Sequence, residues 1–268
     1  MIQRSTSQTT YFAWLGDALW RRRGVNKEIR FLAEKSQDTV TREWDLIAPE
    51  RDAQVAGHHD ASFSSVLEPW VLNRLGEART VIDVGCGTGR LTSSLQRANR
   101  STMGLDPSAA SIAIAREHDT ESDYVIATVE DWTAENPAAR FDLVVANMVL
   151  MDTLRVDDVC AALAHLAQAG KVVLTLTHPA FWPLYWGYAS NPGFDYSKEI
   201  LIEAPFKTSS HEFALTATHV HRPLSSYIDA LKNNGFELSH FEELRGPEDP
   251  AIFPFPRFIG IEAVPRGS

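Results

Sequence analysis

The first 75 residues of the chain place their apolar side chains mostly at helical spacing. Two such sets are Tyr11, Leu15, Ala18 and Leu19, and Ile29, Leu32 and Ala33. A third apolar set runs from residue 67 to residue 75 and ends at Gly76, a residue type that commonly follows a helix. This pattern predicts a helical N-terminal cap segment over residues 1–75.

Beyond residue 76 the spacing changes to that of buried strands. Five short apolar runs predict strands at residues 81–84, 102–106, 124–127, 141–146 and 171–177. Helical patterns fill intervals between them at residues 91–98, 109–117 and 159–169. Apolar strands that alternate with helices are typical of a parallel sheet covered on both faces. The fold class predicted is therefore α/β, with a doubly wound, mostly parallel sheet.

The last third of the chain is expected to extend this sheet. Residues 178–215 are rich in Pro, Gly and aromatic residues without a clear period, which predicts a lid or insert with a functional role. Regular patterns return at residues 214–220, with a helix over 223–233 and strands near 236–239 and 258–264. We expect seven strands in one Rossmann-like domain over residues 76–264: five parallel strands and a final antiparallel pair. Residues 265–268 resemble the remnant of an expression linker.

Charge and cysteine content limit the classes of function. The formal net charge is −10 and the pI about 5.4, so a nucleic-acid partner is disfavoured. Only two cysteines occur, Cys86 and Cys160, which excludes a disulfide scaffold and favours a cytoplasmic protein. The longest nearly apolar run, residues 143–151, is too short to span a membrane, and no leader segment is evident. We therefore expect no membrane partner.

The first predicted strand runs into a glycine-rich turn that is followed by a helix. Gly85, Gly87 and Gly89 form this turn. Such an arrangement binds nucleotides at the carboxyl ends of parallel strands, because glycine lets the backbone approach the ligand. A dinucleotide fingerprint would need a glycine where Arg90 stands, and a phosphate-binding loop would need Lys followed by Ser or Thr. Neither pattern is present.

Two carboxylates narrow the nature of the ligand. Asp83 at the strand tip would repel a pyrophosphate but attract an ammonium or a sulfonium. Asp106 ends the second strand, 17 positions after Gly89, where a carboxylate can accept hydrogen bonds from both hydroxyls of a ribose. Asp106 as a helix N-cap before Pro107 is an alternative that is compatible with ribose binding. The ligand indicated is a positively charged nucleoside without phosphate.

Four segments in register resemble the motifs of class I S-adenosylmethionine-dependent methyltransferases. They are VIDVGCGTG at residues 81–89, GLDPS at 104–108, VEDW at 129–132 and FDLVVANMVL at 141–150. The resemblance covers about residues 70–180, and HRPLSSY at 221–227 is similar to a segment of members that act on small molecules. It implies a Rossmann-like fold, S-adenosylmethionine as the cofactor and methyl transfer to a small-molecule acceptor.

The resemblance also implies roles for individual residues. Asp83 and the glycine turn would hold the methionine part, Asp106 the ribose, residues 129–132 the adenine, and Asn147 with Met148 the sulfonium end. The cofactor-binding set implied is Asp83, Gly85, Cys86, Gly87, Gly89, Asp106, Pro107, Val129, Glu130, Asp131, Trp132, Asn147 and Met148. Trp132 suits a core position equally well. The sequence departs from many members at Thr128, where they have an acidic residue, and at Arg51, where they have tyrosine.

Aromatic residues follow the fifth predicted strand closely, with five in the eight positions 181–188. They predict a cap over a hydrophobic acceptor pocket, and a packing insert or a dimer interface is the alternative. The candidate catalytic residues are His178, Tyr185 and His221, with His178 the first choice as base because it directly follows the strand. His219 and His221 share one strand face, but no third metal ligand is identified, so no metal is predicted.

The function predicted is transfer of a methyl group from S-adenosylmethionine to a small molecule by a monomer or homodimer. Aminocarboxypropyl transfer and cyclisation of S-adenosylmethionine are alternatives, because they would use the same binding turn. A non-catalytic cofactor-binding module is another alternative. An NAD-dependent oxidoreductase is disfavoured, because Asp83 would repel the pyrophosphate of NAD and Arg90 stands where the dinucleotide fingerprint needs a glycine.

Overall fold

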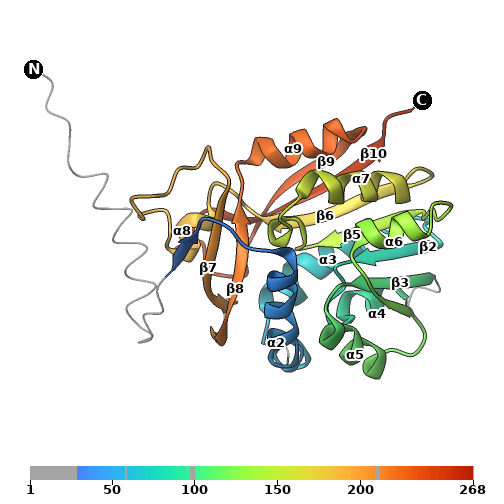
Figure 1. Cartoon of the computed structure of the whole chain (residues 1–268), viewed down its shortest axis with the longest axis horizontal. Coiled ribbons are helices and arrows are strands. Elements are labelled where there is room, and N and C mark those ends of the chain that lie inside the picture. The colour runs from blue at the N-terminus through green and yellow to red at the C-terminus, as the bar shows by residue number, and fades with distance from the viewer. Residues whose placement is uncertain (1–28, 58, 97–99, 209–211, 268) are drawn as a thin grey trace, which may run out of the picture.

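The computed structural model describes residues 29–57, 59–96, 100–208 and 212–267, and Figure 1 shows their arrangement. Seven strands form the main sheet in the order β4-β3-β2-β5-β6-β10-β9. They are β4 (Asp123–Ile126), β3 (Ser101–Asp106), β2 (Thr80–Val84), β5 (Leu143–Asn147), β6 (Lys171–Thr177), β10 (Pro256–Pro265) and β9 (Phe236–Arg245). The first five are parallel, and β10 runs antiparallel to both β6 and β9. The predicted seven-stranded sheet is thus confirmed.

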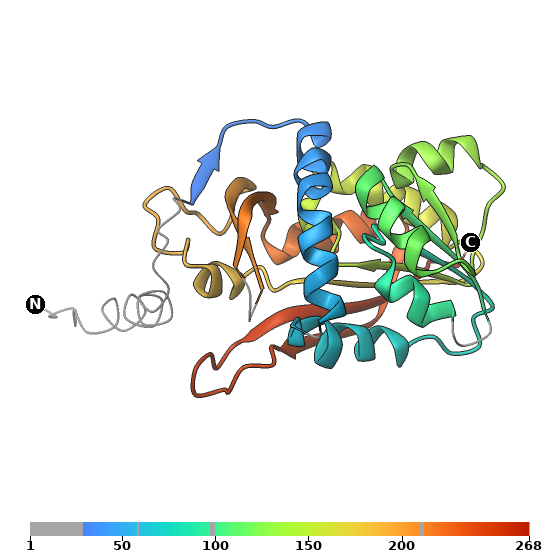
Figure 2. The same ribbon diagram turned by 90° about the horizontal axis from the view of Figure 1, so that it is seen from below.

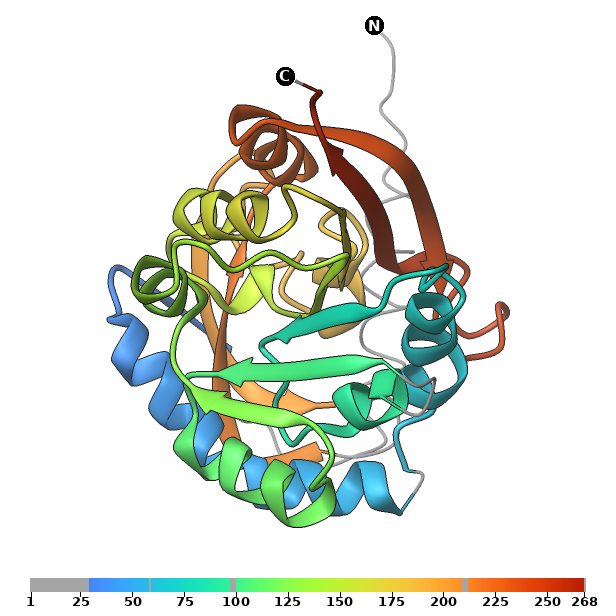
Figure 3. The same ribbon diagram turned by 90° about the vertical axis from the view of Figure 1, so that its right-hand side faces the viewer.

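Helices cover both faces of this sheet. Figure 3 shows α6 (Val129–Glu135), α7 (Val156–Leu166) and α9 (Leu224–Asn233) on one face, and α3 (Glu68–Leu72) with α4 (Arg90–Gln96) on the other. Each face has its own apolar cluster. The central strands are buried between the two clusters: Val144 and Leu174 have no exposed surface. Continuous apolar runs in these strands follow from burial on both faces.

A second, three-stranded antiparallel sheet was not predicted. It has the order β1-β7-β8, formed by β1 (Arg30–Leu32), β7 (Ile200–Lys207) and β8 (Glu212–His221). The prediction of a helix around residues 29–33 is therefore wrong. Ile29 and Phe31, two positions apart, both pack on the apolar cluster that contains α3 and α8 (Trp182–Trp186), so the period here is that of a strand. The predicted helical set at residues 11–19 lies outside the described residues.

The helix α2 (Gln37–Ala56) connects the two sheets. It confirms helical structure in this part of the predicted N-terminal segment, and Ser36 caps it by accepting a hydrogen bond from the Thr39 N–H at 3.3 Å. α2 packs against both β8 and α5 (Ala109–His118), so it crosses from the smaller sheet to the main one (Figure 2). Two short turns of helix, η1 (Phe63–Leu67) and η2 (Leu150–Asp152), complete the described elements. Every described helix is too short or too polar to cross a lipid bilayer.

Candidate active site

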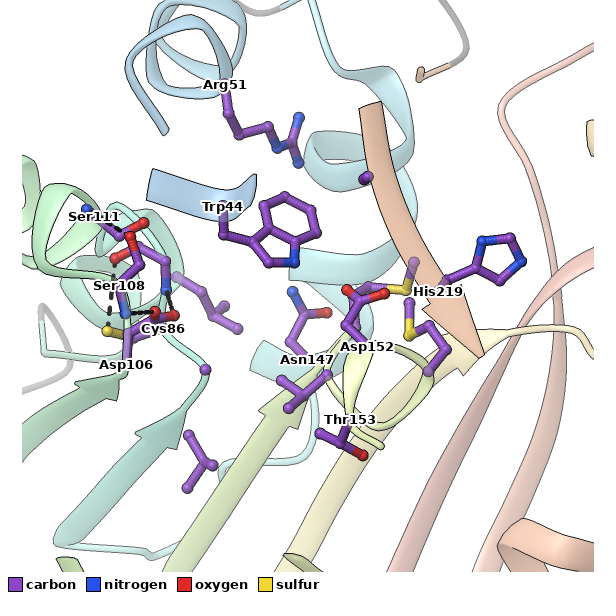
Figure 4. Close-up of a pocket in the computed structure, with 18 of the residues that line it drawn as sticks. Trp44, Arg51, Cys86, Asp106, Ser108, Ser111, Asn147, Asp152, Thr153 and His219 are labelled. Carbon is purple, nitrogen blue, oxygen red and sulfur yellow. Dashed lines mark hydrogen bonds between the residues drawn. The ribbon is translucent and has the colours of Figure 1, made fainter. Parts of the chain in front are cut away.

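A cavity of about 320 Å³ lies at the carboxyl ends of the parallel strands. The ends of β2, β3 and β5 border it on one side, and α2, α8, β7 and β8 border it on the other. Figure 4 shows Asp106 at one side of this cavity and His219 at the other, with Trp44 and Asp152 between them. Ten of the predicted cofactor-binding residues line it: Asp83, Gly85, Cys86, Gly87, Asp106, Pro107, Val129, Glu130, Asn147 and Met148.

The glycine turn needs its glycines for two different reasons. Gly85, Gly87 and Gly89 all have positive φ values, of 69°, 54° and 77°. A Cβ at Gly89 would also lie 2.6 Å from the Tyr124 hydroxyl and 2.8 Å from the Cβ of Ala115. A Cβ at Gly87 would meet nothing within 4 Å, because this residue borders the cavity. Gly89 is therefore a packing residue, whereas Gly87 leaves open space for a ligand.

This difference predicts unequal effects of two alanine substitutions on the free energy of unfolding. Gly87→Ala should cost about 1 kcal/mol, since only backbone strain is added. Gly89→Ala should cost about 2–4 kcal/mol, because crowding against Tyr124 and Ala115 adds to the same strain. Urea denaturation of both variants measures the difference. Equal losses of stability would show that the close approach at Gly89 is relieved without cost.

Asp83 is a buried carboxyl without a cationic partner among the described residues. It is 1% exposed, and its Oδ2 accepts a hydrogen bond from the Thr92 hydroxyl at 2.7 Å. Burial raises the pKa of Asp83 to about 7, and the nearby charge of Asp106 contributes in the same direction. A bound ammonium or sulfonium would stabilise the ionised form. The site therefore favours a cation here.

Asp106 is held by the backbone of two turns. Its carboxylate accepts hydrogen bonds from the Gly87 N–H at 2.9 Å and the Ser108 N–H at 2.8 Å, as Figure 4 shows. Burial raises its pKa to about 6. Ser108, and not Asp106, is the N-cap of α5. The N-cap alternative for Asp106 is therefore wrong, and each of its oxygens keeps a lone pair that can accept from a ligand hydroxyl.

Only part of the segment predicted to contact the adenine, residues 129–132, lines the cavity. Val129 and Glu130 line the cavity at the start of α6. Asp131 accepts a hydrogen bond from the Thr128 hydroxyl at 2.8 Å and does not line the cavity. Trp132 is 9% exposed and packs on Phe141 in the core, with ring centroids 6.1 Å apart. The structure thus favours the core position for Trp132 over a place in the cofactor wall.

The end of β5 carries a strained residue at the cavity. Met148 has φ +61°, the one positive value outside glycine among the described residues. Its N–H donates to the Thr175 carbonyl at 2.9 Å, and the Thr175 hydroxyl donates to Asn147 Oδ1 at 2.7 Å. Such strain persists where the surroundings fix the backbone, and it is concentrated at functional sites. Bonds from β6 thus hold Asn147 and Met148 in place beside the cavity.

Aromatic side chains line the cavity on the side formed by α2, α8 and β7, which is called its aromatic half. Its walls come from four elements: Trp44 on α2, Trp182 and Trp186 on α8, Phe206 on β7 and Phe258 on β10. Sequence reasoning found the α8 residues but missed Trp44 and Phe206, because nothing local shows that α2 and β7 face the strand ends. Such walls bury apolar surface and attract cations through their ring faces.

His219 on β8 also lines this half, although no sequence pattern favoured it over the other histidines. It is 6% exposed, and its Nε2 lies 3.3 Å from the Tyr188 hydroxyl. Burial lowers its pKa to about 3, with a smaller contribution from His221, so the imidazole is neutral at pH 7. Among described residues, no group of three or more His, Cys, Asp or Glu side chains is placed to hold a metal ion.

The three predicted catalytic residues lie behind the lining of the cavity. The ring Nε2 of His178 lies 2.7 Å from a carboxylate oxygen of Glu243, and the backbone N–H of His178 donates to the Arg257 carbonyl. The Tyr185 hydroxyl donates to Glu248 at 3.3 Å. His221 Nε2 lies 3.2 Å from the carbonyl of Tyr196. None of the three borders the cavity, so each would act through other residues.

Known proteins are similar to the part of the chain that contains the parallel strands β2 to β5. Residues 81–171 match a family model described as "Methyltransferase domain". By this similarity residues 81–171 are termed the methyltransferase domain. The chain is 32% identical over 152 residues to a ubiquinone biosynthesis O-methyltransferase of Serratia proteamaculans, covering 47% of this chain and 63% of that protein. A trans-aconitate 2-methyltransferase of Delftia acidovorans is 37% identical over 78 residues, 28% of this chain and 29% of that protein. The chain thus spans less than two thirds of these relatives.

Solved structures share the fold of the methyltransferase domain and its surroundings. An S-adenosylmethionine-dependent methyltransferase from Mesorhizobium loti aligns with a TM-score of 0.52 at 22% identity, over 74% of this chain and 98% of that one. A 1,6-didemethyltoxoflavin N1-methyltransferase from Burkholderia thailandensis aligns with a TM-score of 0.58 at 15% identity, over 91% and 94%. The predicted Rossmann-like methyltransferase fold is confirmed.

Proposed function

We propose that this protein transfers a methyl group from S-adenosylmethionine to a small-molecule acceptor. One observation carries the proposal: a single cavity joins a glycine turn flanked by Asp83 and Asp106 to an aromatic chamber. The first half has the groups that a cationic nucleoside needs, and the second has room for another molecule beside it. The relatives that match the methyltransferase domain are methyltransferases by name.

The residues of the first half fit S-adenosylmethionine. Gly87 leaves open space over the turn, as a backbone that approaches a ligand requires. Asp83 would pair with the ammonium of the methionine part, and Asp106 would accept hydrogen bonds from the ribose hydroxyls. Val129 and Glu130 would border the adenine. Asn147 and Met148 would border the sulfonium, at the junction with the aromatic half.

The residues of the second half would position the acceptor and exclude water. S-adenosylmethionine supplies an activated methyl group, so methyl transfer depends mainly on alignment of the acceptor atom behind the methyl carbon. Trp44, Trp182, Trp186 and Phe206 would hold an acceptor with an apolar part. His178, Tyr185 and His221, predicted as catalytic residues, lie outside the cavity lining, so we assign them instead a role in positioning the residues of this wall.

The ribose role of Asp106 has a measurable consequence. Asp106→Ala should weaken binding of S-adenosylhomocysteine by about 1.5–3 kcal/mol, or about 10–150-fold, since a charged acceptor of two hydrogen bonds is lost. Isothermal titration calorimetry measures the change. Asp119→Ala is a matched control, because Asp119 makes similar bonds to backbone and hydroxyl groups but lies outside the cavity lining. An unchanged affinity in Asp106→Ala would remove the ribose role.

Analysis of the nucleoside product tests the reaction itself. The protein is incubated with S-adenosylmethionine and a panel of small aromatic and carboxylic acceptors, and the products are separated by mass spectrometry. S-adenosylhomocysteine with an acceptor 14 Da heavier, the mass of an added CH₂, is the expected result. Methylthioadenosine would instead indicate aminocarboxypropyl transfer or cyclisation. Tight binding without any product would favour a non-catalytic module.

The proposal also covers the cellular location, the class of acceptor and the assembly of the protein. A cytoplasmic location rests on the two cysteines, both of which are free and buried in the structure. A small-molecule acceptor, and not a nucleic acid, rests on the net charge and on the size of the cavity. Assembly as a monomer or a homodimer stays a prediction, and size-exclusion chromatography with light scattering would decide between the two.

A further inference from the structure

A carboxyl group in the middle of the cavity has no partner. Asp152 ends η2 and lines the cavity, and Figure 4 shows its side chain between Asp106 and His219, in the region where Asn147 also points inward. Among the described residues, no cation and no hydrogen-bond donor contacts its carboxyl oxygens. Three other acidic residues that line the cavity have partners: Asp83 accepts from Thr92, Asp106 from two backbone N–H groups, and Asp60 pairs with Arg51.

The backbone around Asp152 is nevertheless fixed. Its N–H donates to the Val149 carbonyl at 2.8 Å, and its carbonyl accepts from Gln37 Nε2 at 3.3 Å. Gln37 Oε1 accepts from the Leu154 N–H at 2.9 Å, so the α2 side chain bonds to both sides of this turn. Arg222 donates to the carbonyl of Leu150, two residues before Asp152, and to the carbonyl of Thr153, which follows it. The free carboxyl is therefore presented by a rigid turn.

The surroundings of this carboxyl favour its neutral form. Burial raises the pKa of Asp152 well above its ordinary value, and the negative charge of Glu43 on α2 contributes in the same direction. Glu43 is itself paired with Lys35. On β8, His219 is neutral and offers no compensating charge. At this end of β6 the side chains of Thr175 and Thr177 are uncharged.

Building on the proposed function, we propose that Asp152 is the anionic partner of the reacting sulfonium, and that it makes the cavity select S-adenosylmethionine over S-adenosylhomocysteine. The two nucleosides differ by one methyl group and one positive charge at sulfur. An ionised Asp152 gains a charge partner only with S-adenosylmethionine. After methyl transfer the sulfur is neutral, so Asp152 loses its partner, takes up a proton and no longer holds the product.

Isothermal titration calorimetry of the full chain tests the role of Asp152 by measuring how many protons are released when each nucleoside binds. Binding of S-adenosylmethionine and of S-adenosylhomocysteine is titrated from pH 5 to pH 9 in buffers of different ionisation enthalpy, which gives the number of protons released. Asp83 and Asp106 contribute equally with both nucleosides, because both carry the same amino acid and ribose. We expect S-adenosylmethionine to release more protons than S-adenosylhomocysteine over part of this range. Asp152→Asn should abolish that excess.

Affinities give a second readout. Asp152→Asn should weaken binding of S-adenosylmethionine about tenfold at pH 8 and change binding of S-adenosylhomocysteine less than about twofold. Asp158→Asn, on the exposed face of α7, is the control and should change neither. Equal proton release with both nucleosides in the unmodified protein would overturn the inference, even if Asp152→Asn failed to fold. Absence of heat with both nucleosides would instead overturn the proposed function.

Discussion

Asp83→Asn is expected to stabilise the ligand-free protein at pH 8 while it weakens binding of S-adenosylmethionine. The pKa of this buried carboxyl is raised from 3.8 to about 7, so above pH 7 the folded protein holds a charge that the unfolded chain exposes to water. At 1.36 kcal/mol per pKa unit, the difference corresponds to up to about 4 kcal/mol. Asparagine has the same shape, carries no charge and can still accept the Thr92 hydrogen bond.

The pH dependence of this effect has a definite sign. Between about pH 4 and pH 7 the folded protein binds more protons at Asp83 than the unfolded chain does, so the contribution of Asp83 to stability falls as the pH rises. The free energy of unfolding should therefore be similar in the variant and the unmodified protein near pH 4. The gain in Asp83→Asn should grow through pH 5–7 and level off above pH 7. Urea denaturation at each pH measures it.

Asp142→Asn provides a control of opposite sign. The Asp142 carboxylate accepts hydrogen bonds from the Arg79 and Thr80 N–H groups, both at 2.9 Å, and these bonds lower its pKa. Its contribution to stability is present above pH 4 and is lost on acidification, so Asp142→Asn should destabilise at neutral pH. Should Asp83→Asn also destabilise at pH 8, the buried carboxyl must have a compensating cation in the folded protein.

Asp83→Asn should also weaken binding of S-adenosylmethionine by about 1.5–3 kcal/mol, because a charge-assisted contact to the ammonium becomes a neutral one. Calorimetry on the same samples measures the affinity. Opposite effects on stability and binding are the mark of a residue that is kept for function at a cost to the fold. An affinity unchanged within twofold would place the ammonium elsewhere.

The main sheet could be predicted from sequence because each of its features is local. Every parallel strand is an unbroken apolar run, and the glycine turn directly follows the first of them. The residues proposed to hold the nucleoside lie at or just after the carboxyl ends of strands, and parallel strands bring those ends to one edge. Asp83 and Asp106 were predicted in this way, whereas Asn147 came only from the resemblance to the methyltransferase motifs.

The smaller sheet and the acceptor half depend on contacts between distant segments. Phe31 pairs in register with Ile202, and Glu203 inside the sheet is matched by Lys35 at 2.8 Å. A buried glutamate and Pro205 interrupt the apolar pattern of β7, so the sequence favours a loop there. Trp44 and His219 reach the cavity only because α2 and β8 cross the strand ends. His178 was preferred for its position in the chain, but Glu243 on β9 lies 2.7 Å from its ring.

Arg222→Met should lower the free energy of unfolding by about 3–5 kcal/mol, because one buried side chain satisfies several backbone carbonyls at once. Arg222 is 1% exposed and donates to the carbonyls of Leu150, Thr153 and Leu154 at 3.2, 2.8 and 3.0 Å. It also pairs with Glu199 at 2.6 Å. Methionine fills similar space but leaves these acceptors without a donor.

The same substitution should disturb the site, because the carbonyls that Arg222 holds belong to the turn that presents Asp152. Arg155→Met is the matched control: Arg155 pairs with Asp158 on the surface, with side chains 75% and 50% exposed, and its loss should cost less than about 1 kcal/mol. Thermal and urea denaturation compare the two variants. A loss in Arg222→Met no larger than in Arg155→Met would mean that water replaces the guanidinium, and that the turn does not depend on it.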